Sequence, residues 1–487
     1  MRLKFRQKDI RMIYESVVTS ANRYYHHKNY ARSIACIRCA AFIQYQINYI
    51  LSDRKLDDII YNISRDLVGA RHLQSLDNHR VIFYDAFGLD NKGLTQQYLD
   101  ALFSFDDISV IYIHEYYLDK KSSSIRHLLT RSNATIMELG NVPDLEKISK
   151  LCEIIELYHP SRIICHISPS KSISLLVALY AFKNIVKYNI NLTDHAFWLG
   201  SSNLFDYNFE FRPFGASISY YMRGFSNKQL LYCPYYPWRE ECEFDGFPDK
   251  CRGKTIIFSG GNLYKIQGAD NLFLNIVREI VEKEDNVVFV FAGWGDTAHF
   301  NSFVRKYNLQ ERFYFIGNRR DIDQVFRHVD IFIGTYPIGG GLMNLLAAIN
   351  GKPVLLFKDH DAAGEILLVD DKDSFVFETK EELVTEAQRL VNDETYRHRR
   401  GAYFQASVMT QKMFRARFKE LFLEHRSMEL IDDLRIDESY CSSFLNIVNN
   451  NNKLSIELPV LKATHRFLHW KILLNILLNI NRALRFS

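Results

Sequence analysis

Two hydrophobic patterns follow each other along the chain. Between residues 9 and 75, apolar side chains such as Ile34, Ile37 and Ala41 recur every three or four positions. This spacing predicts helices with one buried face. From Arg80 onward the pattern changes to short continuous apolar runs, rich in β-branched and aromatic residues and separated by helical stretches. Such runs are typical of parallel strands that are covered on both faces.

The apolar runs form two series of expected strands. They lie at residues 81–84, 110–113, 134–137, 162–165 and 196–199, and then at 255–259, 286–291, 313–316, 329–333 and 353–357. A last strand is expected within 373–378, followed by helices from Lys380 to about Arg426. We therefore predict an α/β protein with two Rossmann-like domains, a helical N-terminal extension and a C-terminal amphipathic helix.

The predicted domain boundaries follow the changes in pattern. An aperiodic stretch rich in proline and aromatic residues joins the two series between Leu231 and Gly253. Doubly wound domains bind ligands at the carboxyl ends of their strands, so two facing domains would enclose a cleft. The expected parts are a helical segment at 1–78, a Rossmann-like acceptor domain at 79–235, a nucleotide-sugar domain at 250–425 and a helical tail at 426–487.

Charge is balanced over the body and concentrated at the end. The 487 residues include 61 Lys and Arg and 57 Asp and Glu, a net charge of +4. Five of the basic residues and no acidic one follow Glu457, so the remaining 56 basic and 57 acidic residues leave the body at −1. A near-neutral body argues against a nucleic-acid-binding protein.

The cysteines favour a reducing compartment. All eight are scattered, and Cys36 and Cys39 lie in a helical pattern with no second pair nearby. We interpret them as a buried helix face rather than a redox or zinc site. The basic N-terminal stretch lacks the apolar run of a secretory signal. We expect a cytoplasmic protein.

A glycine-rich turn is the most informative motif. A strand leads into Gly339-Gly340-Gly341, a helix follows, and Gly351 precedes the next apolar run. Glycines at a helix N-terminus let backbone amides and the helix dipole approach a phosphate, which suits a diphosphate. The alternative is a tight strand-to-helix turn without a ligand. The pattern matches neither the P-loop nor the dinucleotide motif.

A lysine follows the first strand of the same domain. Phe258-Ser-Gly-Gly-Asn-Leu-Tyr-Lys265 could place an ammonium group over the glycine turn and neutralise charge on a leaving diphosphate without a metal. The alternative is a solvated loop lysine. The segment Ile316-Gly-Asn-Arg319 ends a third strand and could contact a base.

The second half resembles the nucleotide-binding half of GT-B glycosyltransferases. The resemblance rests on Phe291-Ala-Gly-Trp-Gly, Phe315-Ile-Gly-Asn, Val329-Asp-Ile-Phe-Ile and Gly351-Lys-Pro-Val, and it covers about residues 80–425. Asn262-Leu-Tyr-Lys-Ile looks like the catalytic-lysine motif of the O-GlcNAc transferase group, and Thr335-Tyr-Pro-Ile-Gly-Gly-Gly like its proline and glycine loop. The motifs and the resemblance together assign donor binding to Gly260, Gly261, Asn262, Lys265, Gly293, Ile316, Gly317, Asn318, Arg319, Pro337, Gly339, Gly340, Gly341, Leu342 and Asn344.

One departure from the related retaining enzymes bears on mechanism. The retaining group has two glutamates around the equivalent loop, and their positions fall on Ile338 and Leu346. An apolar residue cannot orient a sugar hydroxyl as a carboxylate does. We therefore expect an inverting, metal-independent displacement with no cofactor beyond the nucleotide-diphosphate sugar.

The acceptor half offers several candidates for the base and for acceptor contacts. Gly88, Asn91 and Gly93 lie in a polar loop after the first strand, which the resemblance puts at the cleft; an ordinary connection is the alternative. His195 is the candidate base with Asp194 beside it, or else a structural histidine. His114 with Glu115, His166 and Asp85 are the other candidates. Arg212 and Arg223 could contact an anionic acceptor or form surface ion pairs.

The tail has its own amphipathic pattern. In residues 465–487, Lys471, Asn475, Asn479 and Arg482 form one polar stripe on an apolar helix that is too short and polar to span a bilayer. We expect it to lie on an anionic membrane surface, the alternative being packing onto the protein or a partner.

Together these features predict a glycosyltransferase that moves a sugar, from a UDP-sugar, to a hydroxyl of a glycan or lipid-linked glycan. The expected place is the inner face of the plasma membrane, in cell-surface polysaccharide synthesis. The alternative is a non-catalytic module that binds a sugar nucleotide or glycan. The sequence gives no oligomeric state.

Overall fold

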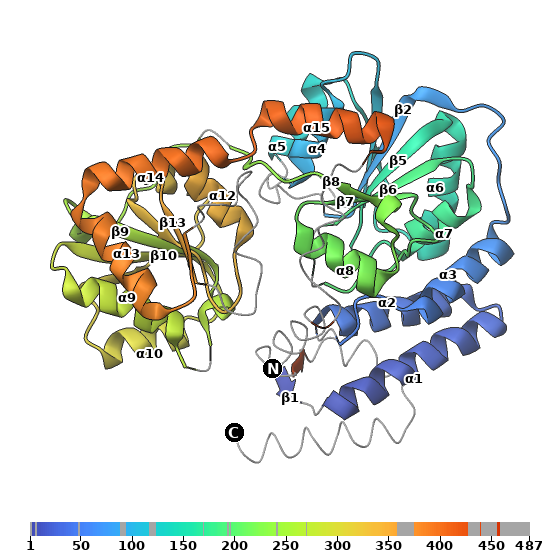
Figure 1. Ribbon diagram of the computed structural model, residues 1–487. Coiled ribbons are helices and arrows are strands. Elements are labelled where there is room, and N and C mark those ends of the chain that lie inside the picture. Colours follow the sequence, from blue (N-terminus) through green and yellow to red (C-terminus); the bar gives the residue numbers. More distant parts are fainter. Residues whose placement is uncertain are drawn as a thin grey trace. The chain divides into compact units, whose positions relative to one another are not determined.

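The computed structural model describes most of the chain and divides it into two compact units. The described residues are 2–4, 7–46, 49–87, 94–115, 123–168, 170–191, 194, 196–239, 242–268, 270–357, 375–426, 439 and 455–457. Unit 1 comprises Met1–Cys233 and Arg417–Ser487, and unit 2 comprises Pro234–Ala416. Figure 1 labels their helices and strands.

Unit 1 is built on a seven-stranded parallel sheet in the order β4-β3-β2-β5-β6-β7-β8. The strands are β2 (Asp77–Asp85), β3 (Ser109–His114), β4 (Thr135–Glu138), β5 (Pro160–His166), β6 (Val186–Ile190), β7 (Tyr207–Glu210) and β8 (Leu230–Tyr232). The helices between them are α4 (Leu94–Leu102), α5 (Ser123–Arg131), α6 (Asp144–Tyr158), α7 (Ile173–Ala181) and α8 (Pro213–Arg223), with the short η2 (Asn227–Gln229). A separate antiparallel pair joins β1 (Arg2–Lys4) to β15 (Ser455–Glu457).

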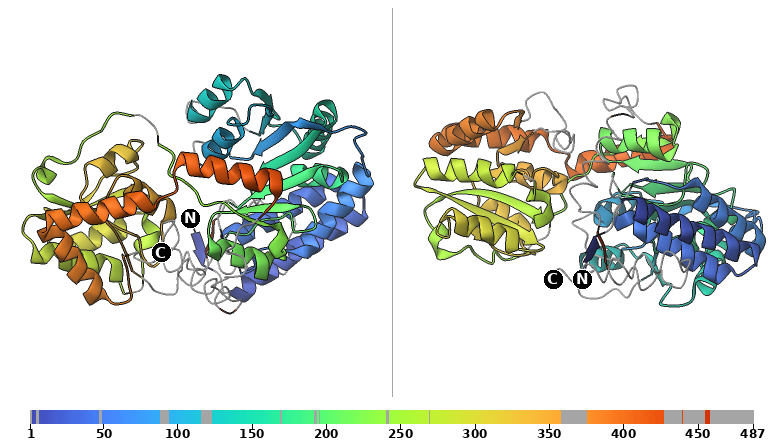
Figure 2. Two further views of the ribbon diagram at one scale, coloured as in Figure 1. Left: turned by 45° about the horizontal axis from the view of Figure 1, so that its top comes forward. Right: turned by 90° about the horizontal axis from the view of Figure 1, so that it is seen from below.

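The predicted N-terminal helices are confirmed as α1 (Gln7–His26), α2 (Tyr30–Gln46) and α3 (Arg54–Leu67). Asp53 caps α3 by accepting a hydrogen bond from the amide of Lys55, and the apolar side chains of α3 lie on one buried face. These helices share one hydrophobic core with the sheet, and Cys36 is fully buried in it. Figure 2 shows them, in dark blue, layered against the helices of unit 1. The helical segment is therefore part of unit 1.

The expected strand at residues 196–199 is wrong. These residues are irregular, and the sheet is extended instead by β6, β7 and β8, which the apolar pattern did not predict. The amide of Trp198 bonds to the carbonyl of Leu51, and that of Gly200 to Asp57, so the segment is held by the N-terminal helices. β6 escaped prediction because it alternates apolar residues with buried polar ones, which find partners only in the folded state.

Unit 2 contains a six-stranded parallel sheet in the order β11-β10-β9-β12-β13-β14, and all six of its predicted strands are confirmed. They are β9 (Thr255–Asn262), β10 (Val287–Trp294), β11 (Phe313–Phe315), β12 (Ile331–Ile333), β13 (Val354–Phe357) and β14 (Phe375–Phe377). The helices are α9 (Leu272–Lys283), α10 (Ala298–Lys306), α11 (Ile322–Arg327), α12 (Gly341–Ile349), α13 (Lys380–Asn392) and α14 (Glu394–Ser407), with the short η3 (Asp249–Cys251) and η4 (Leu263–Ile266).

The last described helix, α15 (Gln411–Glu424), begins in unit 2 and ends in unit 1. Its residues Phe418 and Phe422 pack among buried aromatic rings of unit 1, including Tyr98 and Tyr188. Burial of such large rings contributes about 1.5–3 kcal/mol each. The chain therefore returns to the first unit before residue 425, where the sequence had placed a domain boundary.

No helix in the described part of the chain is both long and apolar enough to cross a bilayer. The amphipathic tail at residues 465–487 lies outside the described residues.

Candidate active site

The second sheet reverses its strand order between β9 and β12, which are neighbours although far apart in sequence. In open α/β sheets ligands bind at the carboxyl end of such a switch point. The glycines after β9 and the loop after β12 both lie there. The donor-binding residues predicted from these two motifs therefore converge on one edge of the sheet.

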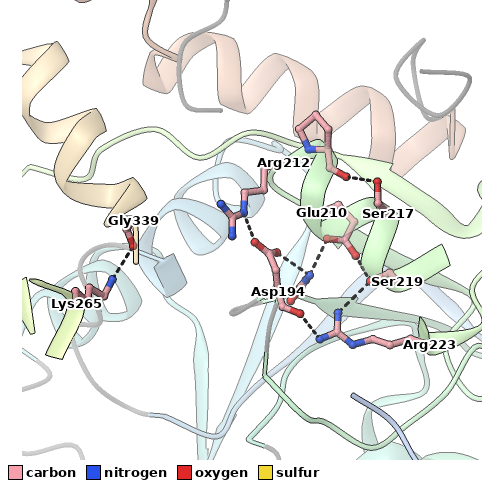
Figure 3. A network of polar contacts seen from close by, with 10 residues as sticks. Asp194, Glu210, Arg212, Ser217, Ser219, Arg223, Lys265 and Gly339 are labelled. Atoms are coloured by element: carbon pink, nitrogen blue, oxygen red, sulfur yellow. Dashed lines mark hydrogen bonds and ion pairs between the residues drawn. The ribbon is translucent and has the colours of Figure 1, made fainter. Parts of the chain in front are cut away.

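Lys265 contacts the glycine loop directly. Its Nζ donates a hydrogen bond to the carbonyl of Gly339 at 3.0 Å, and its own carbonyl accepts from the amide of Ile338 at 3.3 Å. Asn262 caps η4, in which Lys265 lies, by accepting from the amide of Tyr264. Figure 3 shows the lysine directed at the loop carbonyl. Two motifs 74 residues apart thus form one half-buried cationic corner.

The glycines around this corner allow backbones to touch. A Cβ on Gly293 would lie 1.7 Å from the carbonyl oxygen of Gly261, and one on Gly260 would lie 2.6 Å from Cε of Met343. The neighbouring strands β9 and β10 therefore approach with no room for a side chain. Gly260 and Gly293 are required by packing, whatever ligand the edge binds.

Gly340 caps the N-terminus of α12, and Thr335 fixes the loop before it by donating to the carbonyl of Ile338 at 2.7 Å. The first amides of a helix have no partner within it and carry the positive end of the dipole. A Cβ on Gly340 would lie 4.0 Å from Nζ of Lys265. The lysine and the first turn of α12, with Gly341 and Leu342, could bind an anion together.

Asn344 supplies an unusual polar group beside this helix terminus. It is only 5% exposed, and neither Oδ1 nor Nδ2 has a hydrogen-bond partner among the described residues. The hydroxyl of Ser259, inside β9, is also buried without a hydrogen-bond partner among the described residues. Leaving a buried polar group unpaired costs about 1–3 kcal/mol. Groups of this kind are expected where a ligand supplies the missing partner.

The segment after β11 is held close to the glycine edge. The amide of Gly293 donates to the carbonyl of Gly317 at 2.7 Å. Asn318 is exposed and Pro337 is partly exposed. Arg319 is engaged, however, because its guanidinium binds both oxygens of Asp321 and the carbonyl of Gly246. This pairing lowers the pKa of Asp321, so the charge of Arg319 is already balanced.

The acceptor-side candidates in unit 1 belong to a buried polar network (Figure 3). Asp194 is 1% exposed and forms an ion pair with Arg212. The guanidinium of Arg223 donates to the carbonyls of Asp194 and Ala196, at 2.6 and 2.7 Å, and lies over the ring of Trp198. Burial and these partners favour structural roles for both arginines over the surface pairing or acceptor contacts expected from the sequence.

Glu210 joins the network at the end of β7. It accepts from Asn191, Asn208 and Ser219, and burial, followed by the nearby charge of Asp194, raises its pKa to about 8. The predicted base His195 and the predicted cleft residues Gly88, Asn91 and Gly93 lie outside the described residues. Asp194 is thus placed in the structure, but its predicted partnership with His195 stays a prediction.

This network leaves no space at Gly215. A Cβ there would lie 2.2 Å from Oδ1 of Asp194 and 2.6 Å from Oε2 of Glu210. We expect Gly215→Ala to destabilise the protein by about 1–3 kcal/mol, because the side chains must move apart. Chemical denaturation measures the change. Tyr220→Ala, at an exposed position of the same helix, should change stability by less than about 0.5 kcal/mol; equal effects would contradict the prediction.

Sequence reasoning missed Ser259 and Thr335. Both are buried polar residues at the switch point: Ser259 follows the apolar run inside β9, and Thr335 lies two residues after β12. A polar residue in that position was the available signal. No cluster of three or more His, Cys, Asp or Glu residues suited to a metal ion occurs in the described part of the chain.

Comparisons with known proteins agree with this architecture. Residues 253–393 match the family model described as Glycosyl transferases group 1. No curated protein matches the chain.

Among solved structures, a mutant of the Thermobaculum terrenum O-GlcNAc transferase is similar at 13% identity over 88% of this chain and 83% of that one, with a TM-score of 0.53. A glycosyltransferase from Rickettsia africae is similar at 11% identity, over 72% and 100%, with a TM-score of 0.54. Anabaena HepE in complex with UDP and glucose is similar at 12% identity, over 71% and 100%, with a TM-score of 0.52. These findings show that the chain has the GT-B fold, and that its residues 253–393 are similar to the Glycosyl transferases group 1 family.

Proposed function

We propose that the protein transfers a sugar from a UDP-sugar to a hydroxyl of a glycan or lipid-linked glycan, with inversion and without a metal, in cell-surface polysaccharide synthesis. The observation that carries the proposal is the contact between Lys265 and the loop at Gly339, beside the N-terminus of α12. The complex of Anabaena HepE with UDP and glucose supports the choice of UDP.

The proposed reaction is a direct displacement. The acceptor oxygen forms a bond to the anomeric carbon while the bond from that carbon to the diphosphate breaks, and its electron pair leaves with the diphosphate. The hydroxyl proton passes to a base of the protein. Lys265 and the first amides of α12 are suited to stabilise the charge that develops on the leaving group.

A screen of donors tests the proposal. UDP-, GDP-, dTDP- and CMP-sugars are compared by thermal shift, and each stabilising donor is then incubated with glycan acceptors. A donor at 100 times its Kd should stabilise the protein by about 2.7 kcal/mol. NMR of the product assigns its anomeric configuration. Binding without turnover on any acceptor would favour the non-catalytic module, and a retained configuration would contradict inversion.

Asn344 gives a sharper test of the donor site. We expect Asn344→Leu to raise the melting temperature, because it removes a buried amide that has no partner in the described part of the chain. It should also weaken UDP-sugar binding about tenfold, because the ligand loses a hydrogen-bonding partner. Calorimetry of binding and of unfolding measures both. As the control, Asn350→Ala removes an amide that already bonds to Asp323 and should lower stability instead. Unchanged UDP affinity in Asn344→Leu would remove this residue from the site.

Membrane association through residues 465–487 is a further part of the proposal. Truncation after Glu457 keeps strand β15 and removes all five basic residues of the tail. We expect it to abolish binding to vesicles containing phosphatidylserine, since each basic residue near such a surface contributes about 1 kcal/mol. Sedimentation with vesicles measures this, with neutral vesicles as the control. Vesicle binding that survives the truncation would refute the tail hypothesis.

A further inference from the structure

The first 52 residues carry a charge that the rest of the body does not share. They include nine Lys and Arg but only Asp9 and Glu15 as acidic residues, a net charge of +7. Residues 53–457 contain 47 basic and 55 acidic residues, a net charge of −8. The near-neutral body is therefore a basic N-terminal part followed by an acidic remainder, and a surface with such an excess of positive charge attracts anions.

Part of this charge lies on the turn between α1 and α2, which we call the basic turn (residues 22–32). Its backbone is held by hydrogen bonds within the turn. The amide of Asn29 donates to the carbonyl of Tyr24 at 2.9 Å, and the side chain of Asn29 accepts from the amide of Arg32 at 3.2 Å. The last residues of α1 and the first residues of α2 thus present their side chains from a fixed frame.

Three cations of the basic turn are not neutralised by a carboxylate. Arg23, Lys28 and Arg32 are exposed, and none of them forms an ion pair with a carboxylate in the described part of the chain. Asp66, near the end of α3, bonds to a tyrosine of the turn at 3.0 Å, but it is also paired with Arg65 at 3.1 Å. The turn therefore keeps positive charge that a ligand can meet.

Two of these cations converge on one aromatic ring. The guanidinium carbons of Arg23, in α1, and Arg32, in α2, lie 5.3 and 5.6 Å from the centroid of Tyr24. The ring attracts both guanidinium groups and restricts them, so less side-chain freedom is lost when they bind. A planar guanidinium binds a carboxylate or a phosphate through two parallel hydrogen bonds. The pair is thus suited to neighbouring acidic groups of one ligand.

Lys28 occupies a backbone position that favours glycine. Its φ is 56°, in the left-handed region just after the end of α1, where glycine is the usual residue. A lysine in this conformation is strained relative to glycine, and residues held in strained conformations cluster at functional sites. The lysine side chain therefore lowers the stability of the turn, and a role in binding gives a reason for its presence.

The composition of the basic turn fits a glycan better than a membrane. Residues 22–32 contain no Leu, Ile, Val, Phe, Met or Trp, the side chains that enter a bilayer interface. They contain three half-buried tyrosines instead, Tyr24, Tyr25 and Tyr30. Tyrosine rings offer rigid contact area, and their negative faces attract the C–H groups of sugar rings. Cations beside such rings select sugars that carry acidic groups.

We infer that the basic turn binds an anionic glycan, one whose sugars carry carboxylate or phosphate groups, and that it thereby recruits the acceptor. The inference rests on the proposed sugar transfer to a glycan and adds the charge of that glycan. Arg23, Lys28 and Arg32 bind the acidic groups, and the tyrosine rings contact the sugars. The surface belongs entirely to unit 1 and shares no residue with the donor site.

Removal of both arginines tests the role of charge. Polygalacturonate is the probe, because each of its sugars carries a carboxylate, and uncharged dextran is the control ligand. We expect Arg23→Gln combined with Arg32→Gln to raise the Kd for polygalacturonate about tenfold, with the Kd for UDP unchanged. Arg252→Gln combined with Arg305→Gln removes two exposed arginines of unit 2 and should keep the Kd for polygalacturonate within about twofold. Equal losses in the two double variants, or equally tight binding of dextran by the wild-type protein, would overturn the inference.

Lys28→Gly separates binding from stability. We expect a higher melting temperature, because glycine adopts the left-handed conformation without strain, together with about threefold to tenfold weaker binding of polygalacturonate, because a cation is lost. A purely structural residue would not move the two quantities in opposite directions. Asn133→Gly changes another left-handed position, with a φ of 50°, and should leave the Kd unchanged. Unchanged or tighter polygalacturonate binding by Lys28→Gly would contradict the inference.

A membrane surface is the rival partner. The full chain and its Arg23→Gln, Arg32→Gln variant should sediment equally with vesicles containing phosphatidylserine. Loss of vesicle binding in the variant would assign the basic turn to a membrane and overturn the inference. Failure of the proposed function gives a different result, because the wild-type protein would then turn over no UDP-sugar, whereas the Kd for polygalacturonate is measured without a donor.

Discussion

Lys265→Ala should lower kcat/KM for sugar transfer about 10²–10³-fold and weaken UDP binding. The alanine removes the ammonium group that lies against the loop at Gly339, beside the N-terminus of α12. Loss of a single preorganised group that stabilises developing charge typically has an effect of this size. Steady-state kinetics and calorimetry with UDP measure both quantities.

Lys254→Ala is the matched control for this variant. Lys254 directly precedes the same strand at its opposite end and is exposed. It should leave both kcat/KM and UDP affinity unchanged. Lys265→Arg should restore part of the UDP affinity, since the positive charge returns with a different shape. Normal transfer by Lys265→Ala would show that the leaving group is stabilised elsewhere.

Gly340→Asp should abolish donor binding, whereas Gly340→Ala should reduce it only slightly. The φ of Gly340 is −121°, and a Cβ would meet its nearest neighbours at 3.4 Å or more, so the backbone and the space accept an alanine. An aspartate instead adds a carboxylate one bond beyond a Cβ that would lie 4.0 Å from Nζ of Lys265, at the N-terminus of α12. There it competes with a diphosphate for the same cation and amides.

Calorimetric titration with UDP distinguishes the two variants. Both should unfold near the wild-type temperature, because an acidic residue at a helix N-terminus is itself favourable. Equal losses of UDP affinity in both variants would indicate that any added side chain at Gly340 blocks binding, and that the negative charge of the aspartate has no separate effect. Unchanged affinity in Gly340→Asp would mean that no diphosphate binds at this helix terminus.

The sequence predicted unit 2 well because its strands are continuous apolar runs. The runs at 255–259 and 286–291 are buried on both faces, and the same apolar character that marks them drives their burial. In unit 1 the apolar pattern does not predict β6, because Lys187 and Asn189 interrupt it. Asn189 is buried because it bonds to Asn208 on the next strand, a partner that no local rule identifies.

The candidate site residues also divide into those that a local pattern identifies and those that depend on distant partners. Gly339–Gly341 and Lys265 could be singled out from the sequence because glycine and lysine after a strand have a direct chemical interpretation. The pairing of Arg212 with Asp194 could not, and neither could the burial of Arg223 over Trp198. Whether an arginine meets solvent, substrate or a buried carboxylate depends on residues distant in the chain.

The sequence by itself determined the class of fold, the two sheets, the glycine loop and its lysine, because each is encoded in a short pattern with a local physical meaning. Only the tertiary structure decided that the N-terminal helices share the core of the first sheet, and that β2 and β5 are neighbours. That adjacency places Asp85 beside His166, 81 residues away, and one imidazole nitrogen of His166 has no partner among the described residues. Strand order arises from long-range packing, so the pairing of two residues at a switch point is visible only after folding.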